Sequence, residues 1–234
     1  MKTLVIIPAY NEANNLPKVI SDLQRYPEYD YVIVNDGSKD ETVKLCKDNG
    51  WNMLDLPVNI GLAAGIQTGM RFAKLHNYDF AIQIDGDGQH RPEFITAMLN
   101  MIPDTDIVIG SRFVSGGKNG GMRILGSNLI QFAILLTTRK KITDPTSGMR
   151  LYNRKMINAF ADGIDFAPEP DTLAYLIRSG ARIKEVAVKI DDRISGKSYI
   201  NASQAVRYML HMFFSIILFQ FVRKKLSLES MADD

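Results

Sequence analysis

The sequence predicts an α/β fold whose main element is a doubly wound, mainly parallel sheet. Short apolar runs rich in Val and Ile alternate with stretches long enough for helices through the first half of the chain. These runs lack strict alternation of apolar and polar residues, which is typical of strands that are covered on both faces. The repeated order of strand and helix implies right-handed crossovers, with helices on both faces of one sheet.

Strands and helices are expected in strict alternation in this first half. The expected strands are Thr3–Ile7, Tyr31–Val34, Asn52–Leu56, Phe80–Ile84 and Ile107–Ile109. The expected helices are Glu12–Arg25, Asp40–Asn49, Gly61–Leu75 and Pro92–Met101, where Asp40 suits an N-cap and Pro92 a first turn. After a looser, glycine-rich region over 110–152, the pattern predicts a helix at Phe166–Ser179, a late strand at Ile183–Ile190 and a polar loop at Arg193–Tyr199.

Length and composition bound the class of protein. The 234 residues suffice for one large domain or two small ones, and 46% hydrophobic with 23% charged residues is typical of a globular protein with a core. Lys and Arg number 28 against 26 Asp and Glu, so charge alone indicates no nucleic-acid binding. The single cysteine, Cys46, excludes an internal disulfide and fits a reducing, cytosolic setting. We expect one α/β domain over residues 1–200 and a C-terminal helix and tail over 201–234.

Polar, turn-rich segments follow three of the expected strands. They are Pro8-Ala9-Tyr10-Asn11-Glu12 after the first, Asn35-Asp36-Gly37-Ser38 after the second and Asp85-Gly86-Asp87-Gly88-Gln89-His90 after the fourth. Ligands of open sheets bind outside the carboxyl ends of the strands, so we expect the three segments to converge on one rim. One such segment is usually a plain loop, whereas three at the same rim indicate a site.

Asp85 and Asp87 are the sharpest feature of that rim. Two carboxylates two residues apart after a buried strand repel each other unless a cation or hydrogen-bond donors compensate them. Mg²⁺ or Mn²⁺ commonly joins one or two carboxylates to substrate phosphates, and Gln89 can add a third oxygen. An EF-hand loop is disfavoured because its twelfth position would be Thr96 rather than Glu. A solvated turn is the alternative for this segment.

Asp36 ends the second expected strand, where a carboxylate can accept hydrogen bonds from a base or a ribose. Asp-Gly turns are also common without any ligand. Two familiar nucleotide motifs are absent from the sequence: the first strand leads into Pro-Ala-Tyr-Asn-Glu rather than G-x-G-x-x-G, and the chain holds no G-x-x-x-x-G-K-[ST]. An NAD-dependent enzyme and a P-loop NTPase are therefore disfavoured.

Five motifs follow one another along the chain: Pro8-Ala9-Tyr10-Asn11-Glu12, Asn35-Asp36-Gly37-Ser38, Asn59-x-Gly61, Asp85-x-Asp87 and Gly110-Ser111-Arg112. This ordered set resembles the family 2 glycosyltransferases, which have the GT-A fold, and the resemblance runs to about Tyr199. It implies that the sugar donor is bound by Pro8, Tyr10, Glu12, Asp36, Gly61 and Asp85. Asn35 stands where the family usually has the first Asp of Asp-Asp-Gly-Ser, a harmless change if Asp36 contacts the base.

Longer motifs narrow the resemblance within the family. They are Asp85-Gly-Asp87-Gly-Gln89-His90, Gly110-Ser111-Arg112-Phe113, Asp144-Pro-Thr-Ser147-Gly148-Met-Arg150-Leu-Tyr152 and Arg193-x-x-Gly196-Lys197-Ser198. They resemble the polyprenyl-phosphate sugar transferases of the dolichol-phosphate mannose synthase type. This implies that Asp85, Asp87 and Gln89 hold Mg²⁺ or Mn²⁺, with Asp87 also catalytic. It further implies acceptor-phosphate contacts by Arg112, Arg123, Ser127, Arg193 and Lys197, although a solvated surface position is the ordinary alternative for any one arginine.

The resemblance implies an inverting transfer of a sugar from a nucleoside-diphosphate sugar to an undecaprenyl or dolichyl phosphate, at the cytoplasmic face of the membrane. Glu169 is a candidate base or orienter in catalysis, and an acid favoured by the helix dipole at a helix start is the alternative. The alternative function is a soluble family 2 transferase that adds a sugar to a hydroxyl of a glycan or glycolipid in cell-surface polysaccharide synthesis. A non-catalytic nucleotide-sugar-binding module is disfavoured because the carboxylate pair is intact.

The longest apolar stretch, Gln204–Val222, predicts an interfacial helix. Its polar positions form one narrow stripe of a helix, comprising Gln204, Arg207, His211 and Ser215. The fifteen residues from 208 to 222 span roughly 22 Å, short of a ~30 Å hydrocarbon core. Arg223-Lys224-Lys225 suit anionic headgroups at the membrane surface. Packing against a membrane-protein partner or a second copy of the chain is the alternative, and a second apolar helix near Leu129–Leu136 is expected at the same surface.

Overall fold

The computed structural model describes the chain apart from residues 115–120, 164–166, 192–201, 219–221 and 224–234 and the side chains of 121–126 and 202–205. The strands are β1 (Thr3–Ala9), β2 (Asp30–Asp36), β3 (Met53–Leu56), β4 (Phe80–Gln83), β5 (Ile107–Ser111), β6 (Arg150–Asn153) and β7 (Ile183–Ala187). The helices are α1 (Leu16–Leu23), α2 (Thr42–Asp48), α3 (Leu62–Leu75), α4 (Ile95–Leu99), α5 (Gly121–Thr138), α6 (Arg154–Asp162), α7 (Pro170–Arg178) and α8 (Ala202–Ile217). Short 3₁₀ turns lie at η1 (Pro92–Phe94) and η2 (Ile102–Asp104).

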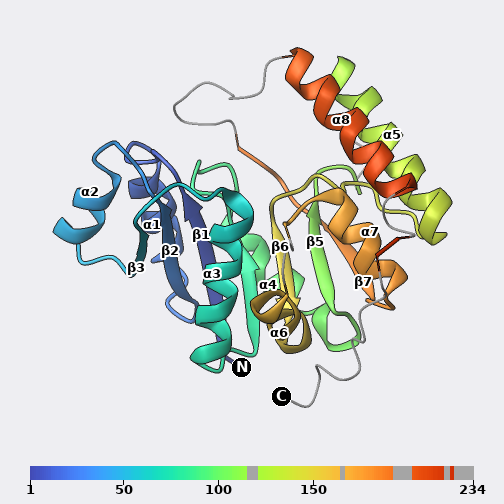
Figure 1. The fold of residues 1–234 in the computed structure, drawn as a ribbon. Helices are drawn as coiled ribbons and strands as arrows, with labels where there is room; N and C mark the ends of the chain where they lie inside the picture. The colour runs from blue at the N-terminus through green and yellow to red at the C-terminus, as the bar shows by residue number, and fades with distance from the viewer. Residues whose placement is uncertain (115–120, 164–166, 192–201, 219–221, 224–234) are drawn as a thin grey trace.

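The described strands form one sheet in the order β3-β2-β1-β4-β6-β5-β7. β6 runs antiparallel to its neighbours β4 and β5, and the other strand pairs are parallel. The prediction of a mainly parallel α/β sheet is therefore confirmed. The carboxyl ends of the parallel strands point toward the same side of the molecule as α5 and α8, the upper side in Figure 1.

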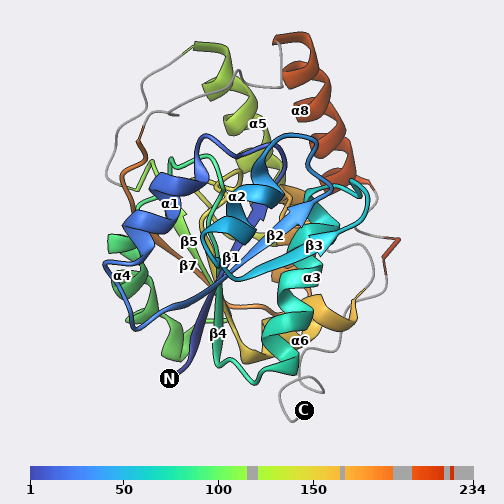
Figure 2. The ribbon, with the colours of Figure 1, turned by 90° about the vertical axis from the view of Figure 1, so that its left-hand side faces the viewer.

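Helices cover both faces of the sheet, as the apolar strands predict. One core cluster joins the sheet to α3, α5, α6, α7 and α8, and the other joins it to α1, α2 and α4 (Figures 1 and 2). Helix α3 approaches β1 so closely that a Cβ atom on Gly69 would overlap the side chain of Ile6. Glycine at this position therefore allows the helix to pack closely against the strand.

Several predicted boundaries are wrong for identifiable reasons. The helix expected from Glu12 begins only at Leu16, because the backbone first forms a turn in which Asn15 N–H and Leu16 N–H donate to the Glu12 carbonyl. Asp40 precedes the N-cap residue of α2, Glu41, although its carboxylate does accept a hydrogen bond from Thr42 N–H at 3.0 Å. The helix expected at Pro92–Met101 is divided into η1 and α4.

The second half of the chain departs further from the prediction. The helix expected from Phe166 begins at Pro170, and the strand expected to reach Ile190 ends at Ala187, beyond which an isolated bridge joins Ile190 to His90. Strand β6 was not predicted, because its four residues hold two polar side chains and no β-branched residue. Its place between β4 and β5 depends on hydrogen bonds to both neighbours rather than on local propensity.

Helix α8 belongs to the core as well as to the surface. It packs against α5 and α7, and its Met212 and Ile216 are buried in the larger apolar cluster. Among the described residues, no helix combines the length and the apolar character needed to cross a membrane. The division of the chain at residue 200 stays a prediction.

Asp106 lies just before β5, at the amino end of that strand, and binds residues of neighbouring elements. Its side chain is 1% exposed and accepts hydrogen bonds from Lys155 Nζ at 2.8 Å, Asn153 Nδ2 at 3.0 Å and Arg182 N–H at 2.7 Å. Burial raises the pKa of this carboxyl, but the hydrogen bonds from these partners lower it more, so the net shift is downward. Asp106 is thus a buried carboxylate that accepts hydrogen bonds from three residues and stabilises the fold at the amino end of β5.

We predict that Asp106→Asn lowers the free energy of unfolding by about 3 kcal/mol at pH 7, because it leaves the Lys155 ammonium without its charge partner. The pKa of Asp106 is lower in the folded chain than its ordinary value of 3.8, so the contribution is complete above that value. The contribution is lost as the pH falls through the lowered pKa. Denaturant unfolding at pH 7 and pH 3 tests this, with the exposed Asp104→Asn as control; an equal difference at both pH values would contradict it.

Candidate active site

The three polar segments converge at the carboxyl edge of the sheet, as predicted. Asn11, whose backbone has a φ of +57°, donates its N–H to Ser38 Oγ at 2.9 Å, and its side-chain oxygen accepts from Lys39 N–H at 2.8 Å. The third segment lies against the first, since a Cβ atom on Gly86 would be 2.9 Å from the Pro8 carbonyl oxygen. The segments after β1, β2 and β4 therefore form one continuous rim.

Asp36 holds the turn that begins α3. Its two carboxylate oxygens accept the N–H groups of Ile60 and Gly61, each at 2.8 Å. Gly61 has a φ of +91°, a conformation that side chains disfavour, so glycine suits this turn. Because each carboxylate oxygen has a second lone pair, Asp36 can hold the turn and still accept a hydrogen bond from a ligand. Its predicted contact with a base stays a prediction.

Asn35 has a specific partner that accounts for the amide at this position. Its Nδ2 donates to Asp55 Oδ1 at 2.7 Å across the β2–β3 pair, and its oxygen accepts from Ser38 N–H at 3.3 Å. A carboxylate in place of this amide would face Asp55 without a proton to share. The neighbouring rim residues differ in burial: Pro8 and Tyr10 are partly exposed, whereas Glu12 is buried and accepts from Asn15 Nδ2 at 2.5 Å.

Asp85 lies two residues beyond β4, and its carboxylate lies close to Gln83 and Gly148. Oδ1 accepts a hydrogen bond from Gln83 Nε2 at 3.3 Å, and the backbone N–H donates to His90 Nδ1 at 3.1 Å. A Cβ atom on Gly148 would be 2.9 Å from Oδ1 and closer still to Oδ2. Only a glycine at 148 therefore leaves this carboxylate in its observed position, with the side chain 36% exposed.

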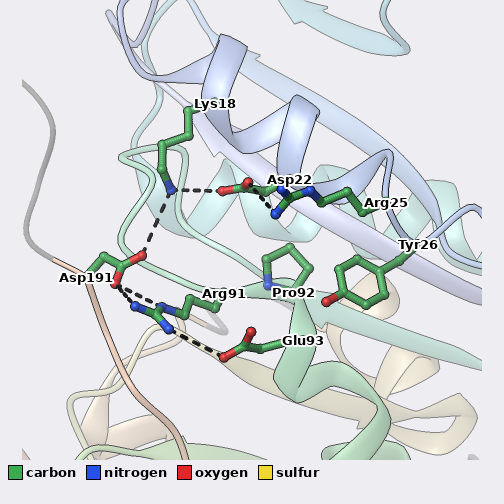
Figure 3. Close-up of a pocket in the computed structure, with 8 residues that line it drawn as sticks. All are labelled: Lys18, Asp22, Arg25, Tyr26, Arg91, Pro92, Glu93 and Asp191. Atoms are coloured by element: carbon green, nitrogen blue, oxygen red, sulfur yellow. Dashed lines mark hydrogen bonds and ion pairs between the residues drawn. The ribbon is translucent and has the colours of Figure 1, made fainter.

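Asp87 and Gln89 complete the predicted set of oxygen ligands. Asp87 Oδ1 accepts from Gln89 N–H at 3.1 Å. Gln89 Nε2 donates to the Asp191 carbonyl at 3.0 Å, which leaves the oxygen of the same terminal amide to act as an acceptor. Asp191 is held in turn by an ion pair with Arg91 and lies 4.0 Å from Lys18 Nζ, as Figure 3 shows.

This donor set fits a divalent cation. Carboxylate and amide oxygens are the ligands that Mg²⁺ and Mn²⁺ prefer, and these ions usually complete their shell with water and substrate phosphate. Within the part of the chain that the structure describes, His, Cys, Asp and Glu side chains form no group of three or more able to hold a metal alone. Asp85, Asp87 and Gln89 would hold such a cation together with water and substrate phosphate.

Arg112, predicted to contact an acceptor phosphate, is paired with a buried carboxylate. Its Nε and one terminal nitrogen each donate to Asp144 at 2.7 Å, and Asp144 is fully buried. The hydrogen bonds that Arg112 donates to Asp144, together with the nearby charges of Asp144 and Asp85, raise the pKa of Arg112. Arg112 thus lies within electrostatic reach of the candidate cation site, and its second terminal nitrogen remains a potential donor to a phosphate.

The other predicted acceptor residues are only partly described. Ser127 on α5 is buried and accepts from Gln131 Nε2 at 3.1 Å; the same nitrogen donates to the Thr143 carbonyl at 2.8 Å, beside Asp144. Ser127 is therefore linked through Gln131 to the segment that carries Asp144, and its contact with an acceptor phosphate stays a prediction. The side chain of Arg123 and all of Arg193 and Lys197 lie outside the described residues.

Glu169 stands at the N-terminus of α7 without capping it. Its carboxylate accepts a hydrogen bond from the Tyr208 hydroxyl on α8 instead. Burial and the charge of Glu169 raise the pKa of Tyr208 well above its usual range, so its hydroxyl keeps its proton. Two residues on, Asp171 accepts from Ser215 Oγ at 2.8 Å. The acids expected at this helix start are thus bound to α8.

Two contributors to the site, Arg150 and Tyr208, were not selected from the sequence. Arg150 is 2% exposed and donates to the carbonyls of Ser147 at 3.0 Å and Pro145 at 2.8 Å, which shapes the loop that carries Gly148. For Arg150, the available signal was its place in the motif that runs from Asp144 to Tyr152. The contact of Tyr208 with Glu169 spans 39 residues, and no local pattern indicates it.

Comparison with known proteins identifies the family and the fold. The family model described as glycosyl transferase family 2 matches residues 4–160. The undecaprenyl-phosphate mannosyltransferase of Micrococcus luteus is 32% identical over 212 residues, 85% of this chain and 87% of the relative. The polyprenol monophosphomannose synthase of Mycolicibacterium smegmatis is 28% identical, over 86% of this chain and 82% of the relative.

A solved structure confirms the fold prediction at low sequence identity. Glucosyl-3-phosphoglycerate synthase from Mycobacterium tuberculosis, in complex with Mn²⁺, UDP-glucose and phosphoglyceric acid, superposes with a TM-score of 0.68 at 17% identity. The match covers 92% of this chain and 79% of that one. The likeness shows a shared α/β glycosyltransferase fold.

The position of Gly148 yields a test of the carboxylate set. We predict that Gly148→Ala displaces the Asp85 carboxylate and weakens binding of Mn²⁺ with UDP or GDP by about tenfold or more. The matched control is Gly65→Ala, since a Cβ atom there would meet its neighbours only at ordinary contact distances of 3.9 Å and beyond. Calorimetry measures the affinity; unchanged binding by the Gly148 variant would contradict the assignment of Asp85 as a ligand.

Proposed function

The chain belongs to glycosyl transferase family 2, and we propose that it transfers a sugar, with inversion, from a nucleoside-diphosphate sugar to a polyprenyl phosphate. The observation that carries the proposal is the juxtaposition of the Asp85–Asp87–Gln89 oxygens with the Arg112–Asp144 pair. The oxygens suit a cation bound to the diphosphate of the donor. The nearby arginine suits the phosphate of the acceptor, so the two substrates would meet at this rim. The relatives named for undecaprenyl and polyprenol acceptors support the acceptor class.

The charges of this rim suit the two reacting groups. Asp85, Asp87 and Gln89 would hold Mg²⁺ or Mn²⁺, which stabilises the negative charge of a departing nucleoside diphosphate. A phosphate monoester has a second pKa near 6 and is largely a dianion at neutral pH. It therefore needs positive groups to orient it more than it needs a strong base. Arg112 supplies the positive charge and Ser127 a hydroxyl donor, and Glu169 takes the proton when the acceptor is in its monoanionic form.

A surface of α5 and α8 supports a membrane location for the acceptor. Large apolar side chains project from both helices, each between 45% and 62% exposed: Phe132, Leu135, Leu136, Val206, Leu210, Phe214 and Leu218. The basic residues Arg139, Lys140 and Lys141 follow α5 and are exposed. Such a surface suits insertion into the headgroup region of an anionic leaflet, with the lysines and arginines at the phosphates. The proposed location is peripheral, at the cytoplasmic face.

Transfer to a hydroxyl of a glycan or glycolipid remains the second candidate, and the Glu169 carboxylate is the observation that favours it. A hydroxyl acceptor requires a base to remove its proton, whereas a phosphate dianion does not. A screen of UDP- and GDP-sugars with Mg²⁺ and Mn²⁺, each offered an isoprenyl phosphate or a glycolipid, separates the two. Formation of a sugar–phosphate lipid supports the first function, and product from the glycolipid alone overturns it.

We predict that Asp87→Asn abolishes transfer while the unfolding temperature stays within a few degrees of the original. The change removes a ligand charge from the candidate cation site, and relief of repulsion with Asp85 offsets what the fold loses. Activity is measured at saturating Mn²⁺, with thermal unfolding as the control. Substantial turnover by the variant would contradict the role of Asp87.

We predict that Leu210→Ser together with Phe214→Ser weakens binding to anionic vesicles by about a hundredfold. The two changes remove about 3 kcal/mol of apolar burial, while the inward-facing Met212 and Ile216 keep α8 in the core. Flotation with vesicles at low and high salt measures this. Leu75→Ser, at the far end of α3 on a leucine that is 77% exposed, is the control.

Equal flotation of the double variant and the original chain would exclude this surface as the membrane contact. A chain that ignores vesicles but self-associates, with the association lost in the double variant, would indicate that a second copy covers the surface instead. Deletion of α8 is a poorer experiment, because it would uncover the part of the core that Met212 and Ile216 close.

A further inference from the structure

Two hydroxyl–carboxylate hydrogen bonds join α8 to the N-terminus of α7. The Tyr208 hydroxyl donates to Glu169 Oε2, and Ser215 Oγ donates to Asp171 Oδ2 at 2.8 Å. Tyr208 and Ser215 are seven residues apart, close to two helical turns, so both project from the same face of α8. The two acids are likewise neighbours at the start of α7. The helices are thus joined by a matched pair of contacts.

The contact to Glu169 is not a helix cap. Glu169 occupies the N-cap position of α7, yet its side chain accepts no hydrogen bond from the first turn. Asn153 shows the ordinary behaviour in the same chain, because at the N-cap of α6 it accepts from Met156 N–H at 3.0 Å. Glu169 is therefore turned away from its own helix. Since the buried phenol of Tyr208 keeps its proton, it can serve as a donor to this carboxylate.

Arg150 connects this pair to the candidate active site. Its charge lies close enough to Tyr208 to influence the phenol, and it stands directly opposite Gln83 in the β4–β6 pairing. Gln83 donates to the Asp85 carboxylate, and the carbonyls that Arg150 binds belong to the loop that places Gly148 against Asp85. Arg150 thus exerts its charge on Tyr208 and also shapes the loop that places Gly148 against Asp85.

The same helix carries the outward apolar surface. Val206, Leu210 and Phe214, spaced by four residues, are 47%, 46% and 52% exposed, whereas Met212 and Ile216 are buried. One face of α8 is therefore available to a membrane while another holds Glu169. Helix α8 therefore carries both the exposed apolar face and the contact with Glu169.

We propose that Tyr208 is a positioning residue that orients the Glu169 carboxylate toward the acceptor, so that the helix facing the lipid also sets the geometry of the acceptor site. This rests on the proposed function and adds a role for α8 beyond attachment. A displaced carboxylate would still be charged but would no longer lie where it can take the proton from the acceptor. The effect should therefore fall on turnover rather than on donor binding.

The experiment compares Tyr208→Phe, Glu169→Gln, their double variant and Ser215→Ala in the full chain, with an isoprenyl phosphate in anionic vesicles. We expect Tyr208→Phe and Glu169→Gln each to lower kcat by about ten- to a hundredfold, with KM for the nucleotide sugar unchanged. The double variant should lose no more than Glu169→Gln alone, because Tyr208 acts through Glu169. Ser215→Ala, which removes the neighbouring contact between the same helices, should stay within about twofold.

Flotation and thermal unfolding distinguish positioning from attachment and packing. Tyr208→Phe should float with vesicles like the original chain and unfold at a temperature similar to that of Ser215→Ala. If Tyr208→Phe does not fold, Glu169→Asp provides the second variant, since it keeps the charge but withdraws the carboxylate from the Tyr208 hydroxyl; a similar loss of kcat is expected.

Three results would overturn the proposal: equal losses in Tyr208→Phe and Ser215→Ala, fully additive losses in the double variant, or full turnover by Glu169→Gln or Glu169→Asp. A failure of the proposed function looks different. In that case the original chain transfers no sugar to any isoprenyl phosphate, whatever the variants do.

Discussion

The segment from Thr143 to Gly148 is the constraint on which the candidate site depends, and hydrogen bonds at both of its ends hold it in place. Glu185 accepts the N–H groups of Thr143 and Asp144, each at 2.9 Å or less, and fixes the start of the segment against β7. Arg150 binds carbonyls at its other end. The segment supplies the carboxylate that orients Arg112 and the glycine that makes room for Asp85, so both halves of the site are aligned by one loop.

Paired charges explain how so many ionisable groups share one rim. Asp144 is fully buried, yet it accepts the Arg112 guanidinium at two nitrogens and the Arg112 backbone N–H as well, which offsets its desolvation. Asp85 accepts a hydrogen bond from Gln83 Nε2 at 3.3 Å, and Asp87 accepts one from Gln89 N–H at 3.1 Å. Asp144 thus shapes the site through its pairing with Arg112, whereas the Asp85 side chain is 36% exposed at the rim.

The sixteen residues of helix α8 contribute to the core, to the contact with α7 and to the exposed surface. Its inner apolar side chains complete the core, its hydroxyls bind the acids of α7, and its outer apolar side chains are exposed. A helix built in this way cannot move on the surface without disturbing the start of α7. Attachment to a membrane and geometry of the acceptor site are therefore expected to be mechanically linked.

The sequence by itself determined the alternating α/β order, the rim where the three polar segments meet and the Asp85-x-Asp87 pair, because buried strands and turn residues leave local patterns. Only the tertiary structure decided the insertion of β6 between β4 and β5, the burial of Asp144 against Arg112, and the contact of Tyr208 with Glu169. These features depend on residues 32 to 39 positions apart, or on hydrogen bonds to two strands at once. The hydrophobic periodicity of the sequence does not predict such partners, because they depend on packing, burial and charge in the folded chain.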